Sequence, residues 1–330
     1  ESVQAGELIK PYPESDSLPV TSFFTRKDNV SLIRHLHTVM NLPYVSFLSE
    51  TNQLNKRLGD IRQLKGKSGF WIKSGSGHAG YEGMNLSWKT MQIGADKKLG
   101  NQVIGIMGSF TQGNAYGYGM SEEHNTSGAG MYWSAVSNHG LFVDVVGKWL
   151  NNRDTFHLPS EIMGTRMAKG SVILGGIQTG WHLNTNDDHF FVEPSVEFVS
   201  GHVSGFSLKG NDVNIRVTAH NMIYSKIGLD AGITWGTSEQ EQTTLSGGIF
   251  KVNNLYATGN VELLDRVGGE NAEWMSRSIR EAERDNHYLS HLSLNTRLSP
   301  RWRIYAELES MSGGGIHHNR TGQVGVRYQF

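Results

Sequence analysis

The C-terminal stretch Gln323-Val-Gly-Val-Arg-Tyr-Gln-Phe330 carries the clearest structural pattern of this chain. Its apolar residues share one parity: Val324, Val326, Tyr328 and Phe330. Its polar residues and its glycine share the other: Gln323, Gly325, Arg327 and Gln329. Successive side chains of a β-strand point to opposite faces, so this pattern predicts a strand with one apolar and one polar face. Strands of soluble sheets alternate too, and the weight of the pattern therefore lies in its repetition.

The same alternation recurs throughout the chain, for example over 141–149, 192–198, 223–235 and 302–308. Twelve strands are expected, beginning near Phe70, Trp88, Val103, Gly128, Leu141, Ser171, Phe190, Met222, Leu245, Tyr288, Arg301 and Gly322. Strands of this kind, with no long apolar run between them, are typical of an outer-membrane barrel. We therefore predict an all-β fold, a 12-stranded antiparallel transmembrane β-barrel with an N-terminal α-helix in its lumen.

The connections between strands support this prediction. Some are tight, such as 185–188, and others are expected to be long: 114–126, 153–168, 205–219 and 258–285. Alternating short and long connections suit a barrel with periplasmic turns and extracellular loops. In the last loop, the i,i+4 pairs Glu273/Arg277 and Arg277/Glu281 suggest a short exposed helix over 270–285.

Aromatic residues near the expected strand ends suggest the girdles of a membrane barrel. They are Trp71, Trp149, Trp181, Trp235, Trp302 and Tyr328. A β-sandwich or soluble barrel is the alternative. It is disfavoured because strands rich in glycine, with charged residues on their polar faces, pack poorly as a dry core.

Composition limits the function classes. The net charge of −1 offers no basic footprint for nucleic acid. No run reaches the roughly 18 apolar residues of a membrane helix, and a mean hydropathy of −0.39 fits strands with one polar face. The chain has no cysteine, which excludes disulfides and thiol chemistry and fits an exported protein. No signal segment opens at Glu1, so we expect a cytosolic chain or a processed fragment.

The N-terminal part divides into two segments before the barrel. Residues 1–43 are expected to be an extended linker, with a helical period over 30–42. Residues 44–66 are predicted to form a basic helix and 68–330 the outer-membrane barrel. A twelve-stranded barrel leaves a lumen that must be occupied, and the helix of 44–66 is the natural plug, although an ordinary surface helix would show the same pattern.

Charged residues of the barrel fall on the lumen parity. They are Asp144, Glu193, Glu197, Asp230, Arg303, Glu307, Glu309 and Arg327. A ring of acids around a basic helix would be electrostatically complementary. The plainer interpretation is that these residues only hydrate the lumen.

Several motifs, in order along the chain, resemble the translocator domain of classical autotransporters, closest to the serine protease autotransporters of enteric bacteria. They are Phe47-Leu-Ser-Glu-Thr-Asn-Gln-Leu-Asn-Lys-Arg-Leu-Gly-Asp-Ile-Arg62, Gly69-Phe-Trp71, Met91-Gln-Ile-Gly-Ala-Asp96, Phe142-Val-Asp144-Val-Val-Gly147-Lys148, Val192-Glu193-Pro194 with Glu197, and the terminal Val-Arg-Tyr-Gln-Phe330. The resemblance covers roughly 47–330. It implies an outer-membrane unit of a Gram-negative bacterium that exports an N-terminal passenger to the cell surface by type V secretion. Residues 1–43 would then be a passenger remnant and linker.

The resemblance also implies self-cleavage inside the barrel. The side-chain amide of an asparagine, here Asn52, would attack its own backbone carbonyl, forming a succinimide and releasing Gln53. Asp144 and Glu197 would orient and polarise the reacting groups, as positioned acids can. Two positions depart from the family pattern: Gln53 stands where a second asparagine is usual, and Gln178 stands where the family has a lumen glutamate. The attacking group belongs to Asn52, so Gln53 is expected to be tolerated. Glutamine at position 178 can hydrogen-bond but cannot carry charge or transfer a proton, so slow or absent cleavage is expected. Any activity would be a single-turnover, intramolecular self-cleavage.

The remaining expectations follow from the same resemblance. Partners would be outer-membrane lipid, the chain's own passenger and the barrel-assembly machinery, which would recognise Val326, Tyr328 and Phe330. A monomer is expected, with no nucleic acid, no cofactor and no metal. The histidine pairs His287/His291 and His317/His318 lack a fitting carboxylate or cysteine nearby in sequence. The rival functions are a stand-alone channel or porin, and a surface protease or adhesin using the long loops.

Overall fold

The computed structural model describes residues 29–46, 68–236, 242–265, 274–278, 287–313 and 315–330. Its long strands are β1 (Gly69–Tyr81), β2 (Met84–Leu99), β3 (Gln102–Gly117), β4 (Met120–Val136), β5 (Leu141–His157), β6 (Thr165–Trp181), β8 (Phe190–Val203), β11 (His220–Trp235), β12 (Thr243–Thr258), β15 (His287–Arg297), β16 (Trp302–Ser312) and β17 (Ile316–Gln329). The short strands are β7 (Leu183–Asn184), β9 (Phe206–Lys209), β10 (Val213–Val217), β13 (Asn260–Asp265) and β14 (Trp274–Ser278). The helix α2 spans Asn29–Met40.

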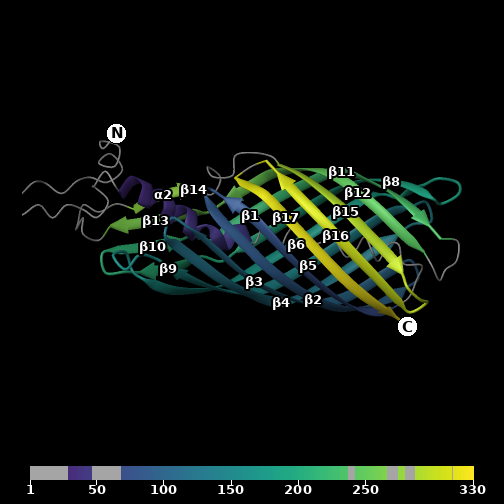
Figure 1. Cartoon of the computed structure of the whole chain (residues 1–330), viewed down its shortest axis with the longest axis horizontal. Coiled ribbons are helices and arrows are strands. Elements are labelled where there is room, and N and C mark those ends of the chain that lie inside the picture. The colour runs from purple at the N-terminus through teal and green to yellow at the C-terminus, as the bar shows by residue number, and fades with distance from the viewer. Residues whose placement is uncertain (1–28, 47–67, 237–241, 266–273, 279–286, 314) are drawn as a thin grey trace, which may run out of the picture.

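The long strands close into one antiparallel barrel (Figure 1). Each strand pairs with its sequence neighbours among the twelve, β17 pairs with β1, and β8 pairs with β11 across the insertion of β9 and β10. The predicted 12-stranded barrel is therefore confirmed. Closure leaves no open edge, so every strand has a hydrogen-bonded neighbour on both sides.

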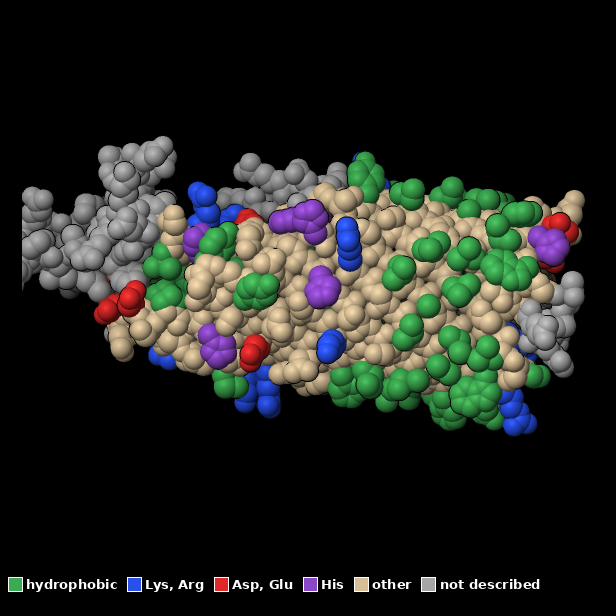
Figure 2. Space-filling view, viewed as in Figure 1, with side chains coloured by type: hydrophobic (Ala, Val, Ile, Leu, Met, Phe, Trp, Pro, Cys, Tyr) green, Lys and Arg blue, Asp and Glu red, His purple; other side chains and the backbone are tan. Residues whose placement is uncertain are grey.

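The alternating strands place apolar side chains outside and polar side chains inside, the reverse of the burial pattern of a soluble protein. In β8, Phe190, Val192 and Phe198 point outward and are about half exposed, whereas Glu193 and Glu197 point inward and are buried. Figure 2 shows the outward apolar side chains gathered over the part of the barrel nearer the C-terminus. An apolar outer band around a polar interior is the arrangement expected for a barrel in lipid.

The two ends of the barrel differ. At the end that holds Phe330, called here the C-terminal end, turns such as 100–101 and 137–140 join the strands. At the opposite end, called the loop end, β9, β10, β13 and β14 form a separate four-stranded sheet (Figure 1). The barrel therefore has one end with mostly tight turns and one end with structured extensions.

Three of the connections expected to be long are shortened or organised by strand pairing. Between β3 and β4, a two-residue turn replaces the loop expected over 114–126, and its residues Tyr118 and Gly119 have positive φ values of 57° and 73°. This geometry matches the right-handed twist of a hairpin. The connection after β5 is reduced to 158–164, and the one over 205–219 contains the hairpin of β9 and β10.

The helix expected within 270–285 is wrong in its described part. Residues Trp274–Ser278 form β14, which pairs with β13 through five register positions from Asn260↔Ser278 to Leu264↔Trp274. Helical i,i+4 ion pairs contribute only about 0.2–0.5 kcal/mol each, which is less than the stabilisation that a paired strand gains.

The helix predicted from the period over 30–42 is confirmed as α2, and it lies in the lumen at the loop end. Its apolar side chains Leu36, Val39 and Met40 are fully buried, and a further helical turn over 42–46 continues inward. The segment 44–66 falls largely outside the described residues. No helix in the described part of the chain is long and apolar enough to cross a membrane.

One of the expected girdle aromatics lies inside the barrel instead. Trp71 is buried, and its indole N–H donates to the Tyr132 hydroxyl at 3.0 Å. The ring lies over Gly94, where any Cβ would come within 2.2 Å of it. Strand parity decided this position, because Trp71 follows the outward-facing Phe70 by one residue.

Candidate functional site

The residues predicted to support cleavage lie in one row across neighbouring strands. In this first lumen row, direct register partners run from β4 to β11: Ser134, Asp144, Gln178, Glu197 and Lys226. Directly opposed residues have Cβ atoms about 4.5–5.5 Å apart, so each side chain can reach the next. Asp144, Gln178 and Glu197, which are far apart in sequence, are therefore neighbours in space.

The hydrogen bonds of the first lumen row hold its polar groups in place. The Ser134 hydroxyl donates to Asp144 Oδ1 at 2.6 Å, and the Gln178 amide donates to Ser195 Oγ at 3.2 Å. Asp144 is fully buried and Glu197 almost so. A buried carboxylate in a fixed orientation is suited to accept a proton or polarise an amide that reaches it.

A second lumen row lies nearer the C-terminal end. It joins Glu193, Asp230, His291 and Glu309 in register, with Gly248 between Asp230 and His291. Gly248 has no side chain, and a Cβ there would come within 2.0 Å of Asp230 Oδ1. This gap lets Asp230 reach past β12 to form an ion pair with His291 Nε2.

A cavity of about 550 Å³ is lined by residues of both rows, although Asp144 and Ser134 of the first row are not among them. Its lining includes Gln178, Glu197 and Lys226 from the first row and the four polar side chains of the second. Glu307 lines it as well and accepts a hydrogen bond from Ser293 at 3.4 Å. The lumen there presents more carboxylates than cations among the described residues that line it, so a basic peptide segment would be attracted to it.

The predicted cleavage junction, Asn52 and Gln53, lies outside the described residues. The described residues on either side of it are at different heights of the barrel. The Ser46 hydroxyl is 3.5 Å from His124 Nδ1 in the lumen. Ser68 is at the C-terminal end, where its carbonyl accepts from the Phe330 N–H at 3.1 Å.

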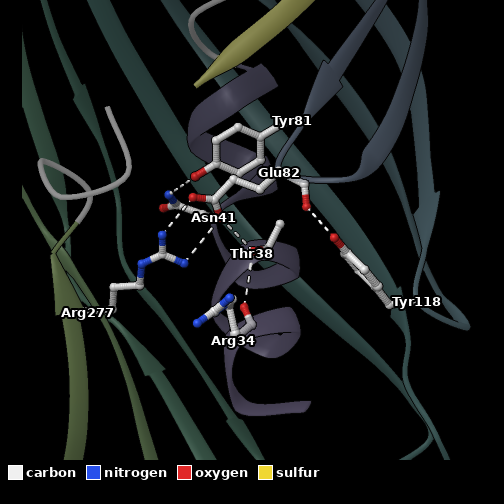
Figure 3. A network of polar contacts seen from close by, with 7 residues as sticks. All are labelled: Arg34, Thr38, Asn41, Tyr81, Glu82, Tyr118 and Arg277. Atoms are coloured by element: carbon white, nitrogen blue, oxygen red, sulfur yellow. Dashed lines mark hydrogen bonds and ion pairs between the residues drawn. The ribbon is translucent and has the colours of Figure 1, made fainter. Parts of the chain in front are cut away.

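Figure 3 shows how α2 is held at the loop end. Glu82, in the turn after β1, accepts a hydrogen bond from Thr38 at 2.7 Å and is paired with Arg277 of β14, with a shortest N···O distance of 2.6 Å. At the inner end of the helix, the Asn41 amide donates to the Tyr81 hydroxyl at 2.9 Å. Glu82 thus joins the helix, a barrel turn and the extension sheet.

The imidazole of His37 is a further feature of the helix contact. Burial, followed by the nearby Arg277 guanidinium, lowers the pKa of His37 from 6.5 to about 4. The side chain is therefore neutral at pH 7, and it packs within the extension sheet and the helix without a charge to solvate.

Arg327, predicted to face the lumen, lies at the seam between the last and first strands. It forms a buried ion pair with Asp96 of β2, donating to Oδ2 at 2.8 Å, and the Tyr132 hydroxyl donates to the same oxygen at 2.6 Å. Gly69 lies beneath the guanidinium, where a Cβ would approach Arg327 Nη2 to 3.1 Å. The motif residues Gly69, Asp96 and Arg327 are thus parts of one contact across the seam.

The other predicted residues are placed as follows. Arg303 is buried on the inner face and donates to Asn295 at 3.1 Å. Val326 and Tyr328 are half-buried on the outer face, and Phe330 is exposed, with its ring 5.5 Å from that of Phe70.

Sequence analysis missed several partners of these side chains. Ser134, Ser195 and Tyr132 have no pattern of their own, since serine and tyrosine on a lumen face are common. Their partners Asp144, Gln178 and Asp96 lie on other strands, so only the register between strands brings each pair together.

Comparison with known proteins gives a consistent result. Residues 68–309 match the family model described as the autotransporter beta-domain. The chain is 28% identical over 312 residues to the serine protease Pet autotransporter of Escherichia coli O44:H18, covering 92% of this chain and 23% of that protein. It is 28% identical over 297 residues to the serine protease EspC of Escherichia coli O127:H6, covering 87% of this chain and 22% of that one. The chain thus spans less than a quarter of the length of these relatives.

Solved structures show the same fold. The beta domain of the Bordetella autotransporter BrkA matches with a TM-score of 0.64 at 17% identity, covering 80% of this chain and all of that one. The translocator domain of the autotransporter NalP from Neisseria meningitidis matches with a TM-score of 0.64 at 13% identity, covering 89% of this chain and 99% of that one. At these identities the likeness supports the architecture alone.

Proposed function

This chain belongs to the autotransporter beta-domain family and is the outer-membrane translocator unit of a type V secretion protein, and we propose that its lumen also cleaves the chain to release the passenger. The passenger is attached at the N-terminal side and is exposed on the cell surface. We propose that residues 44–66 cross the lumen and that the chain cleaves itself once between Asn52 and Gln53. The single observation that carries this proposal is the first lumen row, which gathers Asp144, Gln178 and Glu197.

The course of the chain supports the proposed crossing. The described helical segment enters at the loop end and reaches Ser46 inside the barrel, and the chain is next described at Ser68 on the opposite end. A segment that joins these two positions through the lumen would pass the acid-lined cavity. The basic residues within 44–66 are complementary to those acids.

In the proposed reaction, Asn52 Nδ2 attacks the Asn52 carbonyl carbon and closes a five-membered succinimide. Asp144 accepts the amide proton, the bond to Gln53 breaks, and the proton passes to the leaving nitrogen of Gln53. Held in one geometry, the two reacting groups avoid the entropic cost of meeting. Glu197 and Gln178 orient the peptide, and Gln178 can donate and accept hydrogen bonds but cannot transfer a proton.

The experiment is the intact mass of the refolded full chain, followed over days in detergent. A fragment beginning at Gln53 is expected, and it should be absent in Asp144→Asn because that variant lacks the proton acceptor. Positioned acid–base groups typically contribute about 10²–10⁴-fold in rate, which sets the expected loss. Glu123→Gln is the matched control, because Glu123 lies on the outer face with its side chain 65% exposed. A full-length mass that stays constant would instead assign a non-cleaving translocator.

We also propose that the unit acts as a monomer in lipid and is assembled by recognition of its last strand. Its apolar outer band fits a lipid environment, and Phe330 with the outer face of β17 offers an exposed aromatic end to the assembly machinery. The test is Phe330→Ser, which should reduce the amount of folded barrel in outer-membrane fractions. Refolding of the same variant in detergent should be unchanged.

A further inference from the structure

Three potential metal ligands lie together inside the barrel, away from both lumen rows. Glu122 and His124 occupy alternate positions of β4, and Asp154 of β5 is the direct register partner of His124. One donor atom from each side chain lies within 4.8 Å of the donors of the other two, and all three residues are buried. We propose that this cluster is a binding site for a divalent transition-metal ion such as Zn²⁺.

The charge balance of the cluster favours a cation. Two carboxylates lie side by side in a buried wall, and of the three clustered residues only His124 can carry a positive charge. Two adjacent carboxylates cannot both ionise at low cost without compensation, which a metal ion or a shared proton supplies. His124 Nδ1 already faces Glu122 at 3.2 Å.

One carboxylate oxygen of Asp154 is placed to bind a cation. Asp154 Oδ2 accepts a hydrogen bond from Asn152 at 2.7 Å. Asp154 Oδ1 is buried, and its carboxyl can hydrogen-bond to Glu122 only if one of the two acids holds a proton; no other donor for Oδ1 is present among the described residues. A buried carboxylate oxygen without a donor is costly unless a cation or proton occupies the space beside it.

The surroundings hold the cluster in a fixed orientation. Thr126 donates to Asn152 Oδ1 at 2.9 Å, and Asn152 in turn orients Asp154, as residues around a metal centre commonly do. Gly113 of β3 leaves room for the imidazole, since a Cβ there would come within 2.3 Å of the ring. Small cavities of about 20 and 10 Å³ touch His124 but not the two carboxylates, and a volume of about 10–15 Å³ can hold one water beside the imidazole.

The donor set selects the class of ion. One imidazole nitrogen and two carboxylates suit Zn²⁺ and similar first-row ions, whereas Ca²⁺ takes six to eight oxygen ligands. Metal–donor distances near 2.0–2.2 Å require the side chains to move inward by only a fraction of the present spacing. Because Ser46 Oγ is 3.5 Å from His124 Nδ1, a bound ion would lie at the contact between the barrel wall and the lumen segment.

Sequence analysis expected no metal and did not single out these three residues. Glu122 and His124 are two residues apart, which is a ligand spacing for a strand rather than a helix, and Asp154 comes from the next strand. Only the register of β4 with β5 brings the third ligand to the other two.

The test is calorimetric titration of ZnCl₂ into the refolded full chain after removal of metals with EDTA. One equivalent is expected to bind, and Glu122→Gln and Asp154→Asn should each weaken binding at least tenfold. Glu123→Gln, one residue away on the outer face, should bind as the wild type does. Surface binding is controlled with His317→Ala/His318→Ala, which should retain the buried equivalent.

A second readout does not depend on binding heat. Co²⁺ should give a visible absorption band with the wild type and with Glu123→Gln, and none with Glu122→Gln or Asp154→Asn. Heat-modifiable migration on gels verifies that each variant is a folded barrel. Absence of Zn²⁺ binding in the wild type, or binding unaffected by both carboxylate substitutions, would overturn the proposal and assign a shared proton to the pair.

Discussion

At the scale of single residues, several glycines of the strands are explained by the groups that pack against them. Gly94 and Gly248 are places where an inward side chain from a neighbouring strand needs room, for Trp71 and Asp230 respectively. At Gly69 an added Cβ would meet the Tyr328 backbone carbonyl first and the Arg327 guanidinium next. Each glycine therefore matters for what lies over it. A strand glycine commonly marks such a close approach.

The seam between β17 and β1 should depend on the pair of Asp96 and Arg327. Asp96→Asn leaves a buried guanidinium without its charge partner, and we expect the free energy of unfolding to fall by about 3–5 kcal/mol. Urea unfolding of the refolded barrel in detergent measures the change. In the double variant Asp96→Asn/Arg327→Gln the loss should be smaller than the sum of the two single losses; full additivity would show that the pair is not coupled.

Gln178 should limit the rate of the proposed cleavage. In Gln178→Glu, a third carboxyl joins Asp144 and Glu197 in the first lumen row, and adjacent like charges lead one of them to hold a proton that can be passed on. We expect release of the fragment beginning at Gln53 to accelerate about 10–100-fold, within the range of acid–base contributions. Intact mass against time measures it, and an unchanged rate would remove Gln178 from the reaction.

At the scale of elements, α2 is held by polar contacts near its C-terminal end and by apolar burial along its length. Thr38 and Asn41 bond to the turn after β1 and to the end of that strand, and Arg277 of β14 completes the contact through Glu82 (Figure 3). The extension sheet therefore closes over the helix that the barrel surrounds. Loss of Glu82 or of Arg277 should therefore loosen the packing of α2 in the barrel.

The docking of α2 should weaken in mild acid because of His37. Its folded-state pKa of about 4 lies below the ordinary 6.5, so the docked state is fully favoured above pH 6.5 and loses stability as the pH falls toward 4. The loss is about 2 kcal/mol at pH 5. Conductance of the barrel in a planar bilayer should rise between pH 7 and pH 5.

His37→Gln removes the titrating group and should flatten this pH dependence. His78→Gln, at an exposed position on the outer face of β1, is the matched control and should behave as the wild type does. His35 is unsuitable as a control because burial and Arg34 also lower the pKa of its imidazole. A pH response that persists unchanged in His37→Gln would assign it to another group.

At the scale of the whole molecule, the barrel is a conduit whose interior is occupied by its own N-terminal segment. Deletion of residues 1–66 should raise the conductance in a planar bilayer, because it removes the helix from the lumen and leaves the twelve-stranded wall intact. Glu82→Gln, which removes the charge that joins Thr38 and Arg277, should give brief openings in the full chain. Equal conductance of the deletion and the full chain would contradict a plugged lumen.

Much of the architecture follows from the sequence by itself. The period-2 pattern of strands such as 141–149 and the terminal strand determines a closed barrel with an apolar outer face, and both the fold class and the family expectation are confirmed. The helical period over 30–42 likewise predicts α2. These features are local, because residues two to four positions apart determine the faces of a strand and the apolar stripe of a helix.

Only the tertiary structure determined which side chains of different strands become neighbours. The row of Asp144, Gln178 and Glu197, the reach of Asp230 past Gly248 to His291, and the cluster of Glu122, His124 and Asp154 all arise where one strand is aligned with the next. Residues 274–278 form a strand because β13 offers a paired edge. A one-residue change in register moves every side chain to the other face, so alignment between strands, which no local pattern records, determined the sites.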